Sequence, residues 1–162
     1  MMYWLYVGSA FFAGVVLTVA AIVLAMRNLM MEEENIEGSF EEVCGRLEKS
    51  IESASGWGNP VESLDISEDL AQKGQELKNI RKMRNYFLCK APYAARILDK
   101  FPFVSSMMPC SWAVYEKQNG QVYVARMNIP LMSKMFMGNI IGSTMGKVGK
   151  EEDEMMEEIK AA

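Results

Sequence analysis

Residues 110–127 have the sequence CSWAVYEKQNGQVYVARM, in which two alternating segments flank Asn119-Gly120. Apolar and polar side chains that alternate with a period of two indicate β-strands. Asn-Gly between such strands predicts a hairpin with a type I′ turn, which needs a positive φ angle at both central residues. A shift of the register by one residue would turn every side chain to the opposite face. The pairs expected from this turn are Glu116 with Tyr123, Val114 with Ala125, and Trp112 with Met127.

The segments before the hairpin predict further elements of the same domain. Ser39 and Glu42 have the spacing of a capping box, and apolar residues follow at helical intervals until Gly56. Cys44 lies in that apolar stripe, so we expect a packed core thiol there. A strand is expected at residues 77–89 and a helix from Pro92 to about residue 100.

The first 26 residues carry no charged side chain. A helix of this length spans the roughly 30 Å of hydrocarbon in a bilayer. Tyr3, Trp4 and Tyr6 are residue types that settle at a membrane–water interface. A cleaved signal peptide would need a basic first region and a shorter apolar run, and a buried core helix is the other alternative. We therefore expect residues 1–26 to be a single transmembrane anchor.

The charges beside the apolar segment predict its orientation. Arg27, Arg46 and Lys49 follow it, whereas no Lys or Arg precedes it. The positive-inside rule then places the domain on the cytoplasmic face of the cell membrane. Three cysteines, an odd number, fit a reducing compartment.

The remaining chain is long enough for one domain. We expect an acidic linker at residues 27–38, the domain at residues 39–148, and an acidic tail at residues 149–162 that is helical or disordered. The net charge of -4 disfavours nucleic acid as a partner. The sequence contains no histidine, which excludes histidine-dependent triads and histidine-based metal sites.

A glycine stripe is expected near the C-terminus. Residues 131–148 have a helical pattern in which Gly138, Gly142 and Gly146 recur every fourth residue. Such a bare face suits a self-association seam, or a helix at the membrane interface beside the anchor. Close packing on the domain's own sheet is the alternative.

One stretch of the chain is basic. It suits a patch for anionic lipid head groups or for an acidic partner. A solvated strand edge, on which lysines block aggregation, is the alternative. The residues are Lys78, Arg81, Lys82 and Arg84.

Several motifs resemble the family called domain of unknown function 302. The similarity begins near Ser39 and covers about 100 residues of the domain. It implies a compact α+β domain with an antiparallel sheet that associates with itself, and it implies no established reaction. The matching motifs are Asn85-Tyr86-Phe87-Leu88-Cys89, Ala94-Ala95-x-Ile97-Leu98, Phe101-Pro102, Met108-Pro109-Cys110-Ser111-Trp112-Ala113-Val114-Tyr115-Glu116 and Gly120-Gln121-Val122-Tyr123-Val124.

Cys89 and Cys110 are the cysteines at family-like positions. If their strands pair, the two thiols would face each other, which would permit a reversible disulfide or a shared soft ligand. Met107 and Met108 lie next to Cys110, and thioether with thiolate is a donor set suited to Cu(I). Ordinary packed side chains are the alternative, and the sequence assigns no metal.

These observations predict a membrane-tethered, non-enzymatic binding or interaction module. We expect a homo-oligomer or a membrane-protein partner, and a site for an apolar or soft ligand. The alternative is a thiol-based redox protein, or one that handles sulfur or copper, using Cys89 and Cys110. No residue is assigned a catalytic role.

Overall fold

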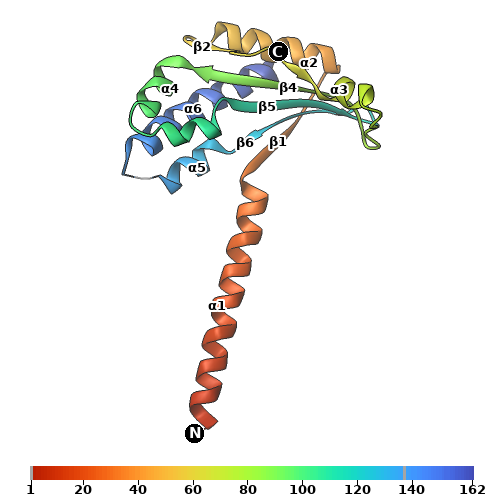
Figure 1. Ribbon diagram of the computed structural model, residues 1–162. Coiled ribbons are helices and arrows are strands. Elements are labelled where there is room, and N and C mark those ends of the chain that lie inside the picture. The colour runs from red at the N-terminus through yellow and green to blue at the C-terminus, as the bar shows by residue number, and fades with distance from the viewer. Residues whose placement is uncertain (1, 137) are drawn as a thin grey trace.

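The computed structural model describes the backbone of residues 2–136 and 138–162, and their side chains except at 2–10 and 27. The first element, α1 (Met2–Leu29), extends away from the domain as a single helix (Figure 1). The domain then contains β1 (Met31–Ile36), α2 (Phe40–Ser53), β2 (Trp57–Gly58), β3 (Leu64–Asp65), α3 (Ile66–Gln72), β4 (Ile80–Lys90), α4 (Ala91–Leu98), the 3₁₀ helix η1 (Pro102–Met107), β5 (Cys110–Lys117), β6 (Val122–Met127), α5 (Ile129–Met135) and α6 (Ile140–Ala161).

The strands form one antiparallel sheet in the order β1-β6-β5-β4-β2, and β3 also pairs with β4. Side chains alternate along the central strands, so Leu88, Trp112 and Val124 face the main core. Helices α2 and α6 supply the rest of that core. Cys44 is buried in it, as predicted, and the Ser39–Glu42 capping box is present. The structure confirms a compact α+β domain with an antiparallel sheet.

The β5–β6 hairpin forms at Asn119-Gly120, but the predicted register is wrong by one residue. In the described backbone, positive φ angles occur only at glycines, among them Gly120 at 82°. A type I′ turn is therefore not formed, because Asn119 would also need a positive φ. The Lys117 N–H donates to the Gln121 carbonyl at 2.9 Å, which closes a three-residue loop. The observed pairs are Glu116 with Val122, Val114 with Val124, and Trp112 with Arg126.

The segment expected as an acidic linker belongs to the sheet, since β1 pairs with β6 along its whole length. Each of its three consecutive glutamates forms an ion pair with a Lys or Arg from another element. Their partners are Arg126 for Glu32 at 2.8 Å, Lys117 for Glu33 at 3.2 Å, and Lys160 for Glu34. The acidic run therefore matches a set of cations that lie far away in the sequence.

The single glycine-striped helix expected at residues 131–148 is two helices, α5 and α6, with Gly138 at the break. Gly138 has a φ of 84°, which ends the helical path. A Cβ atom at Gly142 would overlap the Phe136 carbonyl oxygen, and one at Gly149 would lie 2.7 Å from Pro130. The glycines thus allow α6 to approach α5 of the same chain. Gly138, Gly142 and Gly146 do not form one exposed stripe.

The acidic end of the chain continues α6 as a helix, which is one of the two expected states. Its apolar positions Met155, Met156 and Ile159 are buried in the main core. This segment is therefore an integral part of the domain, because an apolar stripe at helical spacing runs through its glutamates.

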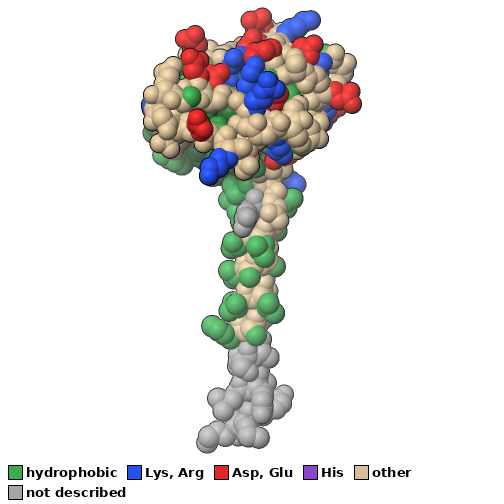
Figure 2. All heavy atoms as spheres, turned by 90° about the vertical axis from the view of Figure 1, so that its right-hand side faces the viewer, with side chains coloured by type: hydrophobic (Ala, Val, Ile, Leu, Met, Phe, Trp, Pro, Cys, Tyr) green, Lys and Arg blue, Asp and Glu red, His purple; other side chains and the backbone are tan. Residues whose placement is uncertain are grey.

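The described side chains of α1 leave much apolar surface exposed. Phe11 is 74% exposed and Leu17 is 70% exposed, and Figure 2 shows hydrophobic side chains along this helix. Within the residues searched, which are those described, no helix combines the length and the apolar character needed to cross a bilayer. Tyr3, Trp4 and Tyr6 lie outside the described side chains.

Candidate functional site

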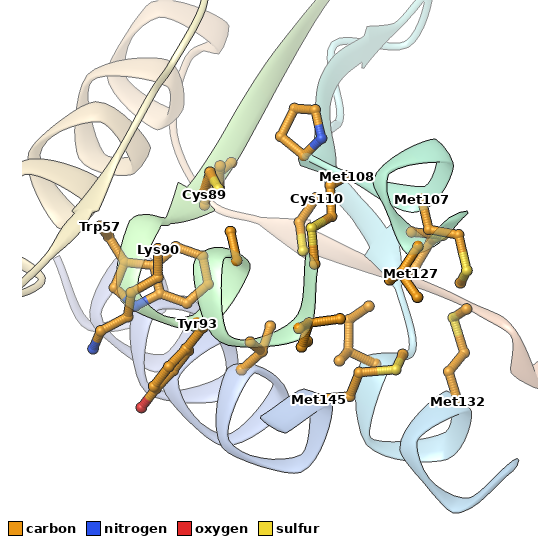
Figure 3. Close-up of a pocket in the computed structure, with 17 residues that line it drawn as sticks. Trp57, Cys89, Lys90, Tyr93, Met107, Met108, Cys110, Met127, Met132 and Met145 are labelled. Carbon is orange, nitrogen blue, oxygen red and sulfur yellow. The ribbon is translucent and has the colours of Figure 1, made fainter. Parts of the chain in front are cut away.

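A cavity of about 60 Å³ lies where β4 and β5 meet the helices α4, η1, α5 and α6 (Figure 3). Its walls are almost entirely apolar. Two cysteines and five methionines are among the 17 lining residues drawn in Figure 3. These sulfur-bearing residues are Cys89, Cys110, Met107, Met108, Met127, Met132 and Met145. We call this space the sulfur-lined cavity.

Local sequence explains why the helices gather around this cavity. Lys90 ends β4, and Pro92 in the first turn of α4 starts a helix at once. Pro102 does the same for η1. A second hydrophobic cluster, separate from the main core, forms between these helices and includes Ile97, Ile129 and Met145. Methionine is flexible and fills irregular gaps, which explains why the remaining space is small.

Cys89 and Cys110 both line the cavity, but they are not a cross-strand pair. In the β4–β5 register Leu88 is opposite Cys110, so Cys89 is displaced by one residue. Adjacent positions on a strand point to opposite faces of the sheet. The predicted pairing of the two cysteines directly across the strands is therefore wrong, although both side chains border the cavity at the ends of their strands. Both cysteines are free thiols.

The electrostatic surroundings keep both thiols protonated. Burial raises the pKa of Cys89, and burial raises the pKa of Cys110 still further with help from the nearby Glu152 carboxylate. The thiolate is the nucleophilic form of cysteine. Neither residue is thus an activated nucleophile at neutral pH.

Glu152 on α6 lies beside the cavity wall. It is 1% exposed, and burial raises its pKa to about 7. The nearby side chains of Cys110 and Trp112 lower the pKa of its carboxyl group in part, as does Arg126, but burial outweighs them. Among the described residues, however, neither Oε1 of Glu152 nor Nε1 of Trp112 completes a hydrogen bond. The fold therefore holds an incompletely satisfied carboxylate next to Cys110.

Arg126 is the cation near this carboxylate. It is 4% exposed and forms ion pairs with Glu32 at 2.8 Å and with Asp153 at 2.5 Å. Its guanidinium carbon lies 5.3 Å from the centre of the Trp112 ring. The positive charge of Arg126 is thus already matched by two other acids, although it also lowers the pKa of Glu152 in part.

Glu151, the residue before Glu152, binds three side chains that line one end of the cavity. Its carboxylate accepts hydrogen bonds from Trp57 Nε1 at 2.6 Å, Lys90 Nζ at 2.7 Å and Tyr93 Oη at 2.6 Å. All three donors belong to cavity-lining residues, and Figure 3 shows them grouped at one end. Burial raises the pKa of Glu151, but these bonds outweigh it and leave the pKa below its usual value. Sequence reasoning missed this group, because no local pattern connects Trp57 with α6.

Residues 32–159 match the family described as "Domain of unknown function DUF302". The chain belongs to the DUF302 family. An uncharacterized protein from Aquifex aeolicus is 30% identical over 123 residues, which are 75% of this chain and 76% of that protein. The crystal structure of an uncharacterized conserved DUF302 protein from Bacillus stearothermophilus is similar with a TM-score of 0.69. It is 20% identical and covers 81% of this chain and 98% of its own, so this similarity concerns the fold.

The basic stretch of this DUF302 domain is matched by acids from other elements. Arg81 pairs with Glu116 at 3.1 Å. Lys82 pairs with Glu41 at 2.9 Å, and Arg84 lies 3.7 Å from a carboxylate oxygen of that same residue. Lys78, the fourth predicted residue, precedes β4. The geometry agrees with a strand carrying surface ion pairs.

Among the described residues, this DUF302 domain has no cluster of carboxylates for a hard metal ion. Within residues 2–136 and 138–162, no three or more Cys, Asp or Glu side chains gather closely enough to hold a metal ion. The cavity instead concentrates thioethers and thiols, which prefer soft ligands.

Proposed function

We propose that this DUF302 chain is a membrane-tethered, non-enzymatic binding module whose sulfur-lined cavity holds a small apolar or soft ligand. The cavity itself is the observation that carries the proposal. Ligand sites are typically concave and mostly apolar, with few polar groups. The two protonated thiols favour binding over nucleophilic catalysis.

The size of the cavity limits the ligand. An apolar cavity of about 150 Å³ holds benzene or xenon, and a water molecule takes up about 30 Å³ of the liquid. The present volume of about 60 Å³ therefore suits a single atom or a molecule of very few atoms. Methionine side chains adapt readily, so the walls allow modest enlargement.

Thiol redox chemistry is the second candidate, because Cys89 and Cys110 line the same cavity. A disulfide needs Cβ atoms that point toward each other. The observed register works against this geometry, since Leu88 rather than Cys89 is opposite Cys110. Binding without disulfide formation is therefore the function that the geometry favours.

The proposed tether is α1, a single helix that extends away from the domain and exposes apolar side chains (Figures 1 and 2). A tether raises the concentration of the domain near membrane partners, so weak contacts suffice. Location at the cytoplasmic face and assembly as a homo-oligomer or with a membrane-protein partner stay predictions.

Xenon is a suitable probe for the cavity, because it is apolar and polarisable. We expect xenon to shift the methyl resonances of Met108, Met132 and Met145 in the full chain labelled with ¹³C-methyl methionine. The methyl groups of Met155 and Met156 in the main core serve as internal controls. Ala94→Phe, which fills the cavity from α4, is expected to abolish the response. Equal shifts for lining and core methyl groups would contradict the proposed binding site.

A further inference from the structure

We propose that the sulfur-lined cavity is a Cu(I) site, with Cys110 as the anionic ligand and methionine thioethers as the neutral ligands. This inference rests on the proposed function for the location of the site, and it specifies the ligand. It concerns a metal that stays in the +1 state, so no oxidant or reductant takes part.

The donor set is the first reason. Soft thiolate and thioether ligands select Cu(I), whereas hard cations prefer oxygen ligands. The cavity brings Cys110 together with methionines from four separate parts of the chain, at η1, β6, α5 and α6. Figure 3 shows Met108 and Cys110 at the centre of the lining, with Met132 and Met145 across from them. The polar groups of the lining belong to Trp57, Lys90 and Tyr93 at one end, where Glu151 holds them.

The buried side chain of Glu152 is the second reason. Glu152 lies next to Cys110, is almost completely buried, and has an oxygen without a hydrogen-bond partner in the described part of the chain. An apolar cavity alone would disfavour any ion. The Cys110 thiolate cancels the single positive charge of bound Cu(I), and an ionised Glu152 beside it repels anions. The site is thus suited to a monovalent cation with soft ligands.

Cu(I) binding exchanges a proton for the metal ion at Cys110 and involves no electron transfer. The Cys110 S–H bond breaks, its proton leaves to solvent, and the sulfur lone pair forms the bond to Cu(I). Because protons compete for the same sulfur, apparent affinity should rise with pH. Methionine thioethers bind through lone pairs and release nothing.

The test is a Cu(I) titration of the reduced full chain in detergent under argon, with bicinchoninate as the competing chromophoric chelator. We expect one Cu(I) per chain and a sulfur-only first shell by X-ray absorption. Cys110→Ser should weaken binding by more than about tenfold, the scale of loss when a metal site is disturbed. Cys44→Ser is the matched control, because Cys44 is a free thiol of the same chain that lies in the main core, away from the cavity.

A second comparison covers the case in which Cys110→Ser fails to fold. Met108→Leu with Met132→Leu should also weaken Cu(I) binding, whereas Met156→Leu in the main core should not. Binding that no cavity variant alters, nitrogen or oxygen neighbours at copper, or no binding in competition with the chelator would each overturn the assignment. If xenon shifts the lining methyl groups but Cu(I) does not bind, the proposed binding cavity stands and the copper assignment falls.

Discussion

Glu151 and Glu152 are neighbours on α6, yet their surroundings give them opposite properties. Glu151 accepts three hydrogen bonds from Trp57, Lys90 and Tyr93 and has a lowered pKa. Glu152 is buried without completing its hydrogen bonds, and its pKa is raised. A buried polar group that lacks a partner costs free energy, so Glu152 is a site where the fold gives up stability.

Replacing Glu152 by Gln should reveal this cost as a pH dependence. Burial raises its pKa from 4.5 in water to about 7 in the fold. The stabilising contribution of the protonated group is therefore fully present below about pH 4.5 and is lost as the pH rises through about 7. As the pH rises from 4 to 8, the free energy of unfolding of Glu152→Gln should increase relative to that of the wild type by about 2–3 kcal/mol. Urea denaturation at the two pH values measures the free energy of unfolding.

The control for this prediction is Glu154→Gln, because Glu154 is an exposed glutamate on the same helix. The free energy of unfolding of Glu154→Gln should differ from that of the wild type by nearly the same amount at the two pH values. A Glu152→Gln variant that follows the wild-type pH dependence would show that Glu152 titrates normally in the fold.

Helices α5 and α6 pack closely against each other at Gly142 and Gly149. The glycine spacing predicts a close approach, and a close approach is observed. The partner is α5 of the same chain, which turns back at Gly138 and presents its carbonyl end to α6. Of the three predicted glycines only Gly142 makes this close approach, and Gly149, outside the predicted set, makes the second one.

Two glycines on α6 allow a matched comparison. A Cβ at Gly142 would overlap the Phe136 carbonyl oxygen and lie 2.9 Å from the Ser133 carbonyl oxygen. Gly142→Ala should lower the free energy of unfolding by about 1–3 kcal/mol, the range for overpacking. A Cβ at Gly146 would have no neighbour closer than 3.9 Å. Gly146→Ala should therefore raise the free energy of unfolding by up to about 1 kcal/mol, because alanine has the higher helix propensity. Thermal and urea denaturation measure both; a stable Gly142→Ala variant would contradict the observed packing.

The whole molecule has two unlike parts, a domain with mixed surface charges and a single apolar helix that extends from it (Figure 2). Helix α1 begins at its end far from the domain, and the C-terminus lies beside α2 (Figure 1). This arrangement would leave the cavity on the domain free of the proposed tether.

Flotation on liposomes tests the proposed tether. We expect the full chain to float with the vesicles, and the double variant Val15→Lys with Val19→Lys to remain below them. Each lysine costs about 2.5–3.5 kcal/mol at the centre of a membrane helix. Val61→Lys, at an exposed position of the domain, is the control and should float. A wild-type chain that stays in the aqueous fraction would contradict the tether.

Much of the candidate site lay beyond prediction from sequence. Cys110, Cys89, Met107 and Met108 were identified by chemistry and by family-like position, and the structure places all of them on one cavity. Met132, Met145, Glu151 and Glu152 joined them only through the fold of α5 and α6. The predicted facing of the two thiols failed because the β4–β5 register places Leu88, and not Cys89, opposite Cys110.

By itself the sequence determined the capping of α2 and the position of the hairpin, and it supplied the residues proposed for a soft ligand; the α+β class was implied by the resemblance to the DUF302 family. These features depend on local spacing, side-chain chemistry and turn residues. The tertiary structure alone decided the strand register, the use of the glutamates of β1, the burial of the acidic end of α6 and the enclosure of a cavity. Those features depend on free energies shared between residues far apart in the chain, such as Trp57 with Glu151 and Glu34 with Lys160.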